Sequence, residues 1–152
     1  MIINVHGNIF EARKNQIICH QVSTKGKMGT GIAKTIKKLF PDIYNAYVNI
    51  CNDANENPLG SVFLAQNNPN EHFIANIFSQ DRYGRDRRYT NYEALAVALE
   101  KLSKRAKELN MDLAIPYKMG CGNAGGNWNI VKTIIEETCV DIDVYIYKME
   151  ED

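Results

Sequence analysis

Two glycine-rich segments constrain the fold of this chain most strongly, residues 26–33 (Gly-Lys-Met-Gly-Thr-Gly-Ile-Ala) and residues 120–126 (Gly-Cys-Gly-Asn-Ala-Gly-Gly). Each follows a run typical of a buried strand and precedes an amphipathic helical pattern. Loops this rich in glycine usually need positive φ angles or a close approach of the backbone to a bulky group. A strand–loop–helix start aims backbone N–H groups at one point, which favours an anion such as phosphate. Two such loops predict a diphosphate held from both sides.

Short apolar runs alternate with helical patterns along the chain. Strands are predicted at Ile2–Val5, Gln16–Val22, Ser61–Gln66, His72–Phe78, Leu113–Tyr117 and Val144–Lys148. Helices are predicted at Gly31–Phe40, Asp42–Cys51, Asn91 to about Asn110, and about Asn127 to Cys139. This alternation predicts an α/β fold, a three-layer α/β/α sandwich with a mixed, mostly parallel central sheet. Ligands bind such sheets beyond the carboxyl ends of the strands, where both glycine-rich segments fall.

Two details of the helices follow from local patterns. The long helix is expected to begin at a capping box formed by Thr90 and Glu93. The last helix is expected to turn Ile130, Ile134 and Ile135 toward the core.

Composition restricts the class of protein. The 152 residues fit one domain, residues 1–152, and 18 basic and 18 acidic residues give zero net charge. General polyanion binding is therefore not expected, although a local basic patch is possible. No apolar run approaches the length of a membrane span, and no signal peptide is expected, so no membrane partner is predicted.

The four cysteines and three histidines do not form a ligand pattern. No two cysteines have the spacing of zinc ligands, and the histidines complete no set, so neither a metal nor a cofactor is expected. Free thiols favour a reduced, cytoplasmic protein.

Two well-known phosphate motifs are excluded. Gly26 and Gly31 have the separation of a P-loop, but Ile32 and Ala33 stand where Lys-Ser/Thr is required. Residues 29–31 begin a dinucleotide fingerprint, yet Lys34 occupies the position of its third glycine.

Several segments together resemble a macrodomain. They are Gly-Asn-Ile-Phe at 7–10, Ile-Ile-Cys-His-Gln-Val-Ser at 17–23, Met-Gly-Thr-Gly-Ile-Ala at 28–33, the block from Ala114 to Trp128, and Val-Tyr-Ile-Tyr at 144–147. The chain is similar to the branch that includes human terminal ADP-ribose protein glycohydrolase and the macrodomain of a chromatin-remodelling helicase. The resemblance implies that residues 1–152 form a single macrodomain whose ligand is ADP-ribose.

The resemblance implies roles for residues at the two ends of this ligand. Asn8 stands where the family has an aspartate, so Asn8 and Ile9 would contact the adenine edge, with Tyr147 beside it. An asparagine can still accept from the exocyclic amine, but without charge assistance. The first glycine loop would wrap the distal phosphate and ribose through Met28, Gly29, Thr30, Gly31 and Ile32, with Ser23 at the floor. The second loop would close the other side through Gly120, Cys121, Gly122, Asn123, Ala124 and Gly125.

The chain departs from the catalytic pattern of this branch. The family lysine is absent from residues 78–81, Phe-Ser-Gln-Asp, and Ala124 stands where the family has an aspartate. A water oriented by a substrate phosphate remains possible, with Gln80, Ser23 and Asn123 as polar partners. Asp81 is the candidate general base, and an ion pair with Arg82, Arg85 or Arg87 is its alternative role.

An Arg/Tyr loop, residues 80–92, interleaves four arginines with three tyrosines. Such a loop can stack on bases and pair with phosphates, or it can act as a lid over the distal ribose.

The sequence is therefore consistent with three functions. The preferred one is binding of ADP-ribose with hydrolysis of a conjugate: an ADP-ribosylated macromolecule, O-acetyl-ADP-ribose or ADP-ribose-1''-phosphate. The alternatives are a non-catalytic ADP-ribose reader and a single-stranded nucleic-acid binder.

Overall fold

The computed structural model describes residues 1–29 and 31–149, and Thr30 lies outside the described residues. Its strands are β1 (Ile2–His6), β2 (Gln16–Ser23), β3 (Val62–Gln66), β4 (Phe73–Gln80), β5 (Asp112–Pro116) and β6 (Val144–Lys148). Its helices are α1 (Gly31–Leu39), α2 (Pro41–Asn52), α3 (Tyr92–Leu109) and α4 (Trp128–Thr138), with a short 3₁₀ turn η1 (Ile9–Glu11) after β1. Each predicted strand and helix is confirmed, with ends that differ by one or two residues.

The strands form one sheet in the order β1-β6-β5-β2-β4-β3. All neighbours pair in parallel except β3, which runs antiparallel to β4 at one edge. The mixed, mostly parallel sheet is therefore confirmed. Among the described residues, no helix is long and apolar enough to cross a membrane.

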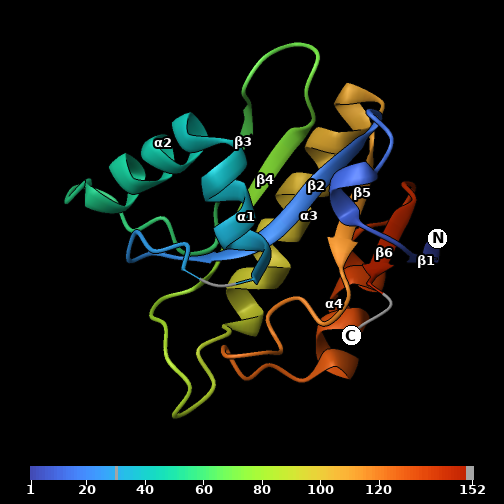
Figure 1. Cartoon of the computed structure of the whole chain (residues 1–152). Helices are drawn as coiled ribbons and strands as arrows, with labels where there is room; N and C mark the ends of the chain where they lie inside the picture. The colour runs from blue at the N-terminus through green and yellow to red at the C-terminus, as the bar shows by residue number, and fades with distance from the viewer. Residues whose placement is uncertain (30, 150–152) are drawn as a thin grey trace.

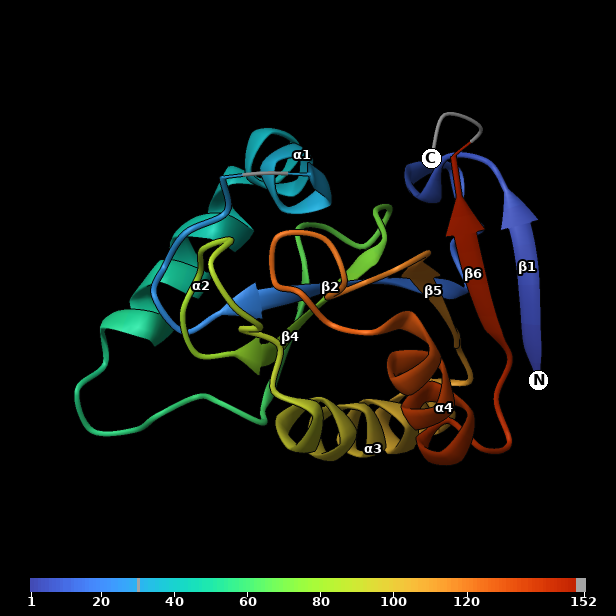
Figure 2. The ribbon, with the colours of Figure 1, turned by 90° about the horizontal axis from the view of Figure 1, so that it is seen from below.

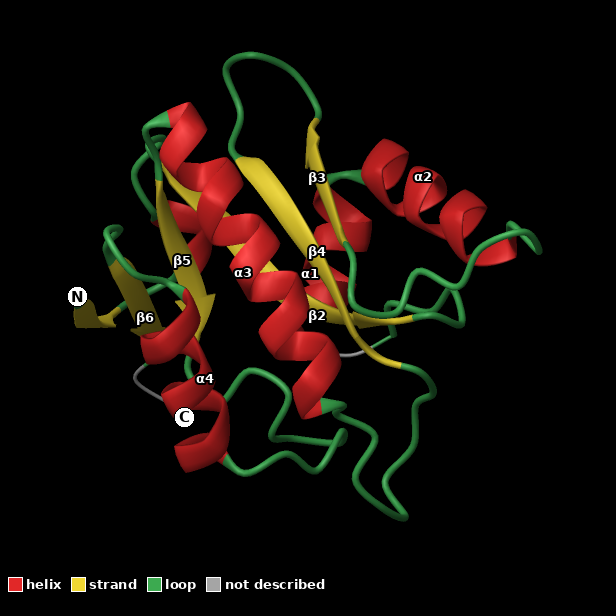
Figure 3. Ribbon diagram, turned by 180° about the vertical axis from the view of Figure 1, so that it is seen from behind, coloured by secondary structure: helices red, strands yellow, loops and turns green. Residues whose placement is uncertain are grey.

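Helices cover both faces of this sheet (Figure 2), while Figure 3 shows α3 and α4 lying together over one face. The side chains of strand β2 alternate between two cores, one on each face of the sheet. Ile17 and Cys19 pack with α3 and α4, whereas Ile18 and Val22 pack with α1 and α2. The strands that were predicted from continuous apolar runs are thus buried on both faces of the sheet.

The connections after β2 and β5 diverge. From β2 the chain passes to α1 and α2 on one face, and from the neighbouring β5 it passes to α4 on the other face (Figure 1). A parallel sheet opens a crevice where two neighbouring strands lead to opposite faces. Both glycine loops begin at this crevice.

Two local expectations are wrong. The cap of α3 is Asn91, whose side-chain oxygen accepts from the Ala94 N–H at 2.9 Å, because Thr90 points its hydroxyl to the Gly120 carbonyl instead. In α4, Ile135 is buried and Ile134 packs against the core, but Ile130 is 43% exposed. Val131 takes the inward position that was expected for Ile130.

This correction gives a paired test on adjacent residues. Ile130→Lys is expected to change the free energy of unfolding by no more than about 0.5 kcal/mol, because the side chain already meets solvent. Val131→Lys buries an unpaired charge and is expected to destabilise the fold by at least about 3 kcal/mol. Urea denaturation of both variants measures the difference, and equal costs would contradict the orientation of α4.

Candidate functional site

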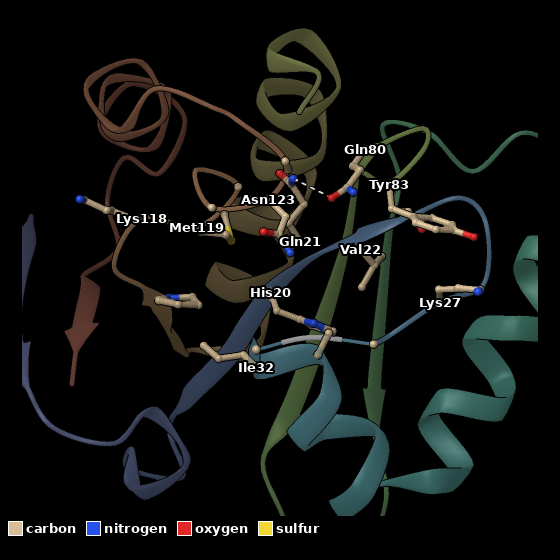
Figure 4. Close-up of a pocket in the computed structure, with 18 of the residues that line it drawn as sticks. His20, Gln21, Val22, Lys27, Ile32, Gln80, Tyr83, Lys118, Met119 and Asn123 are labelled. Carbon is tan, nitrogen blue, oxygen red and sulfur yellow. Dashed lines mark hydrogen bonds between the residues drawn. The ribbon is translucent and has the colours of Figure 1, made fainter. Parts of the chain in front are cut away.

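A cavity of about 600 Å³ lies at the carboxyl ends of β2, β4 and β5. Its walls are the first glycine loop with the start of α1, the Arg/Tyr loop, and the second glycine loop (Figure 4). Small-molecule sites typically occupy roughly 300–1,000 Å³, so the cavity has room for a nucleotide-sized ligand.

The charge of the lining is one-sided. Lys27, Arg85 and Lys118 line the cavity, and within residues 1–29 and 31–149 no aspartate or glutamate lines it. The chain as a whole carries zero net charge, so this concentration of cations is local. The electrostatics of the cavity therefore favour an anion.

The glycines of the two loops differ in what requires them. Gly120 has φ of 76°, and a Cβ there would lie 2.8 Å from the Gln21 side-chain oxygen, so the fold itself needs glycine. Gly29 and Gly122 line the cavity from opposite loops, yet neither has a positive φ and a Cβ on either would meet nothing within 4 Å. Their missing side chains therefore leave space that the protein does not fill.

The Arg/Tyr loop is tied to both glycine loops. The backbone N–H groups of Tyr89 and Thr90 donate to the Ala124 carbonyl at 2.7 and 3.2 Å, which joins this loop to the second glycine loop. On the other side the Lys27 ammonium lies 5.3 Å from the ring centre of Tyr83, which is 50% exposed. The three loops therefore form one continuous rim around the cavity.

His20 lies almost fully buried at the wall of the cavity. Its Nε2 lies 2.6 Å from the Asn76 side-chain oxygen, and Asn76 donates its own amide to the Phe63 carbonyl. Nε2 is therefore the protonated nitrogen, and the buried Nδ1 has no partner among the described residues. Burial lowers the pKa of His20 to about 4, and the bond to Asn76 opposes this shift. The imidazole is neutral at pH 7.

A second hollow of about 410 Å³ lies beside β1 and β6, at one edge of the sheet. Asn8 and Tyr147, which the resemblance assigned to the same end of the ligand, both line it, with Gln16 and Arg13 among their neighbours. Pro116 of the cavity wall is the register partner of Tyr147, so the walls of the two hollows lie on neighbouring strands. The cavity and the second hollow are together called the elongated site.

The carboxamide of Asn8 is partly engaged. Its oxygen accepts from the Phe10 N–H at 2.9 Å and caps η1. Tyr147 donates its hydroxyl to the Gln16 side-chain oxygen at 2.8 Å. Ile9 is buried in the core below and lines neither hollow.

Most of the loop residues named from the sequence are brought together at the cavity. Those that line it are Ser23, Gly29, Gly31, Ile32, Gln80, Gly120, Gly122, Asn123 and Ala124. Met28 is instead buried in the core, and Cys121 and Gly125 do not line the cavity. Cys121 turns its thiol to the Met119 carbonyl, and burial raises the pKa of the thiol.

Asp81 does not line the cavity, against the expectation for a general base. Its carboxylate accepts the Thr24 hydroxyl at 2.9 Å, and this hydroxyl also lies 2.7 Å from the Asp81 carbonyl. Among residues 1–29 and 31–149 it forms no ion pair either, so the alternative role as a partner of the nearby arginines is not observed. Asp81 holds the start of the Arg/Tyr loop against Thr24, which follows β2 and precedes the first glycine loop.

Sequence reasoning missed several lining residues. Lys27, Lys118 and Gln21 lie within or beside the recognised segments, but no motif distinguishes them from other polar residues. For Tyr83 and Arg85, the mixture of arginines and tyrosines in loop 80–92 was the sequence pattern that could have identified them as site residues. In the part of the chain that the structure describes, no group of three His, Cys, Asp or Glu side chains is placed to hold a metal ion.

Comparison with known proteins agrees with this architecture. The family model "Macro domain" matches residues 19–135, so this chain belongs to the macrodomain family. The DNA ADP-ribosyl glycohydrolase of Thermus aquaticus is 30% identical over 97% of this chain, which spans 41% of that protein's length. The ADP-ribose 1''-phosphate phosphatase of Candida albicans is 27% identical over 90% of this chain and 93% of its own length.

A solved structure agrees as well. The macrodomain of Thermus aquaticus DarG has a TM-score of 0.79 and 30% identity to this chain, with 97% of this chain and 98% of that chain covered.

The buried His20 predicts a pH dependence of stability. Because its pKa is lower in the folded than in the unfolded chain, the unfolded chain binds more protons between pH 6.5 and about 4. Stability therefore falls as the pH falls through this window, by up to about 3 kcal/mol from this one group. Urea denaturation at pH 7.5, 6 and 5 should show a smaller loss for His20→Gln than for the wild type. Identical pH profiles would contradict the buried, neutral imidazole.

Proposed function

We propose that this chain binds ADP-ribose along the elongated site, with the diphosphate between the two glycine loops. The observation that supports the proposal most directly is the cavity between these loops, where the described lining residues include three cations and no carboxylate. Backbone N–H groups of the loops, together with Lys27, Arg85 and Lys118, suit a diphosphate. Membership of the macrodomain family supports the same ligand.

The second hollow suits the adenosine end. Pro116 of the cavity wall pairs in register with Tyr147 of the hollow, so a ligand with its diphosphate in the cavity would reach the hollow across this strand pair. Tyr147 offers an aromatic face, and the amide nitrogen of Asn8 remains available because its oxygen caps η1. The distal ribose then lies toward the Arg/Tyr loop.

We further propose hydrolysis of an ADP-ribose conjugate, such as an ADP-ribosylated macromolecule, O-acetyl-ADP-ribose or ADP-ribose-1''-phosphate. The two relatives named above are enzymes of this kind, one acting on ADP-ribosyl DNA and the other on ADP-ribose 1''-phosphate. No carboxylate base lines the cavity in the part of the chain that the structure describes. An attacking water would therefore be oriented by the substrate's own phosphate with Ser23, Gln80 or Asn123, each of which lines the cavity.

A second candidate function, single-stranded nucleic-acid binding, has its own supporting observation. Residues 12–41 contain seven basic residues and no acidic one, and the Arg/Tyr loop adds four arginines at the rim. Arg87 and Arg88 lie over the rings of Tyr89 and Tyr92 at 5.0 and 4.3 Å. Both arginines are exposed and both tyrosines are half-buried. Arginine and tyrosine side chains at a rim can stack on bases.

Calorimetry with ADP-ribose, AMP and a short single-stranded RNA separates the two functions. We expect ADP-ribose to bind more tightly than AMP, because AMP lacks the second phosphate and the distal ribose. RNA binding that weakens steeply with salt, together with no heat from ADP-ribose, would overturn the first proposal in favour of the second.

Gly29→Ala and Gly122→Ala test where the diphosphate lies. Apart from its neighbours in the chain, a methyl group on either residue meets no atom of the described residues within 4 Å, so the melting temperature of the ligand-free protein should not fall. The same methyl enters the space assigned to the ligand, and overpacking of about 1–3 kcal/mol corresponds to roughly five- to 150-fold weaker ADP-ribose binding. Unchanged affinity in both variants would place the diphosphate elsewhere.

Hydrolysis is tested with a panel of ADP-ribosylated DNA, ADP-ribosylated protein, O-acetyl-ADP-ribose and ADP-ribose-1''-phosphate. We expect turnover of at least one member, whereas binding without turnover of any would identify a reader. Because Asp81 bonds to Thr24 outside the cavity lining, Asp81→Ala is expected to keep most of the activity found. A loss of roughly 100-fold or more, about 3 kcal/mol, would restore Asp81 as the base.

A further inference from the structure

Gln21 is at the centre of a hydrogen-bond network below the Arg/Tyr loop. Its side-chain oxygen accepts the Ser79 hydroxyl at 2.6 Å. Its side-chain nitrogen donates to the Gln80 side-chain oxygen at 3.1 Å and to the Thr90 hydroxyl oxygen at 2.9 Å. The network therefore joins β2, the end of β4 and the end of the Arg/Tyr loop.

The orientation of the Gln21 amide is determined by its neighbours. The Thr90 hydroxyl donates its only proton to the Gly120 carbonyl at 2.6 Å, so its oxygen must accept from Gln21. On the opposite side Ser79 has an acceptor in the Gln21 oxygen. The Gln21 nitrogen consequently faces Gln80.

The orientation of the Gln21 amide in turn determines whether Gln80 points the oxygen or the nitrogen of its own amide toward Gln21. An N–H of Gln21 faces Gln80, so Gln80 must turn its oxygen to Gln21 (Figure 4, dashed line). The nitrogen of the same amide, with two N–H donors, has no protein partner among the described residues, and Gln80 lines the cavity. Gln80 is thus presented as a donor, although a glutamine amide on its own could present either end.

We propose that Gln21 is a positioning residue, which holds Gln80 so that its N–H group donates to an oxygen acceptor of the bound ADP-ribose conjugate. The inference rests on the proposed function, because it concerns an oxygen of that ligand. The ligand class it selects is one with a phosphate, carbonyl or ring oxygen at the boundary of β4 and the Arg/Tyr loop. A ligand that presents only a donor there, such as an N–H group, is disfavoured.

Gln21→Glu tests the polarity with almost no change of shape. The ionised carboxylate introduced by this substitution can still accept from Ser79, but it cannot donate to Gln80. The Gln80 amide is then expected to reverse, donate to the new carboxylate and present its oxygen to the cavity. ADP-ribose binding should weaken about tenfold or more, since a hydrogen bond to the ligand becomes a repulsion between two acceptors.

Side-chain ¹⁵N–¹H resonances report the reversal directly, which a merely structural role would not predict. In the wild type the Gln21 amide protons should exchange slowly and those of Gln80 rapidly, and ADP-ribose should slow the exchange at Gln80. In Gln21→Glu the Gln80 amide protons should exchange slowly before any ligand is added. Rapid exchange at Gln80 in this variant would overturn the inference.

Two further variants complete the test. Gln66→Glu adds the same charge at an exposed position on β3 and should bind ADP-ribose as the wild type does. Gln80→Met removes the donor and should lose about tenfold by itself, with no further loss when combined with Gln21→Glu. It also serves if Gln21→Glu does not fold, because wild-type affinity in Gln80→Met would overturn the inference.

The outcomes distinguish the two proposals. If the wild-type chain does not bind ADP-ribose, the proposed function fails and this inference fails with it. If the wild type binds but Gln21→Glu binds equally well, the proposed function stands and the inference alone is wrong.

Discussion

The rest of the site depends on the parallel pairing of β2 with β5, because the chain leaves these two neighbouring strands toward opposite faces of the sheet. The divergence opens a crevice that no helix can cover, and both glycine loops begin at its edge. Side chains buried on both faces of β2 hold the strand in register, so the crevice is a consequence of the core. The location of the candidate site is therefore as stable as the sheet itself.

Hydrogen bonds that start from the core give the rim its shape. Gln21 leaves β2 and contacts Thr90, which in turn donates to Gly120 of the second glycine loop. Backbone N–H groups beside Thr90 reach the Ala124 carbonyl. Three segments far apart in the sequence are thus joined through one threonine side chain and one carbonyl. Thr90 faces Gln21 and the second glycine loop, and Asn91 caps α3.

Much of the fold was predictable because its signals are local. Apolar runs marked the strands, and the period of the helices was clear enough to place all four within one or two residues. The failure at Ile130 shows the limit of such patterns: Ile130 and Val131 are both apolar neighbours on α4, and the position of α3 decides which one is buried. Some lining residues, such as Gly29 and Gly122, could be predicted because the spacing of the glycines marks the two loops. The contribution of Lys27, Lys118 and Gln21 was not, because a polar residue in a loop carries no local sign of the direction in which it points.

The sequence by itself determined the α/β alternation, the two glycine loops at strand ends and the resemblance to macrodomains, since each depends on residues close together in the chain. The tertiary structure alone decided that the loops face one cavity, that its lining is cationic in a neutral chain, and that Asp81 bonds to Thr24 outside it. It also decided the polarity of Gln80, through Ser79, Thr90 and Gln21. The direction of a hydrogen bond depends on every neighbour of the group, and those neighbours come from three separate segments.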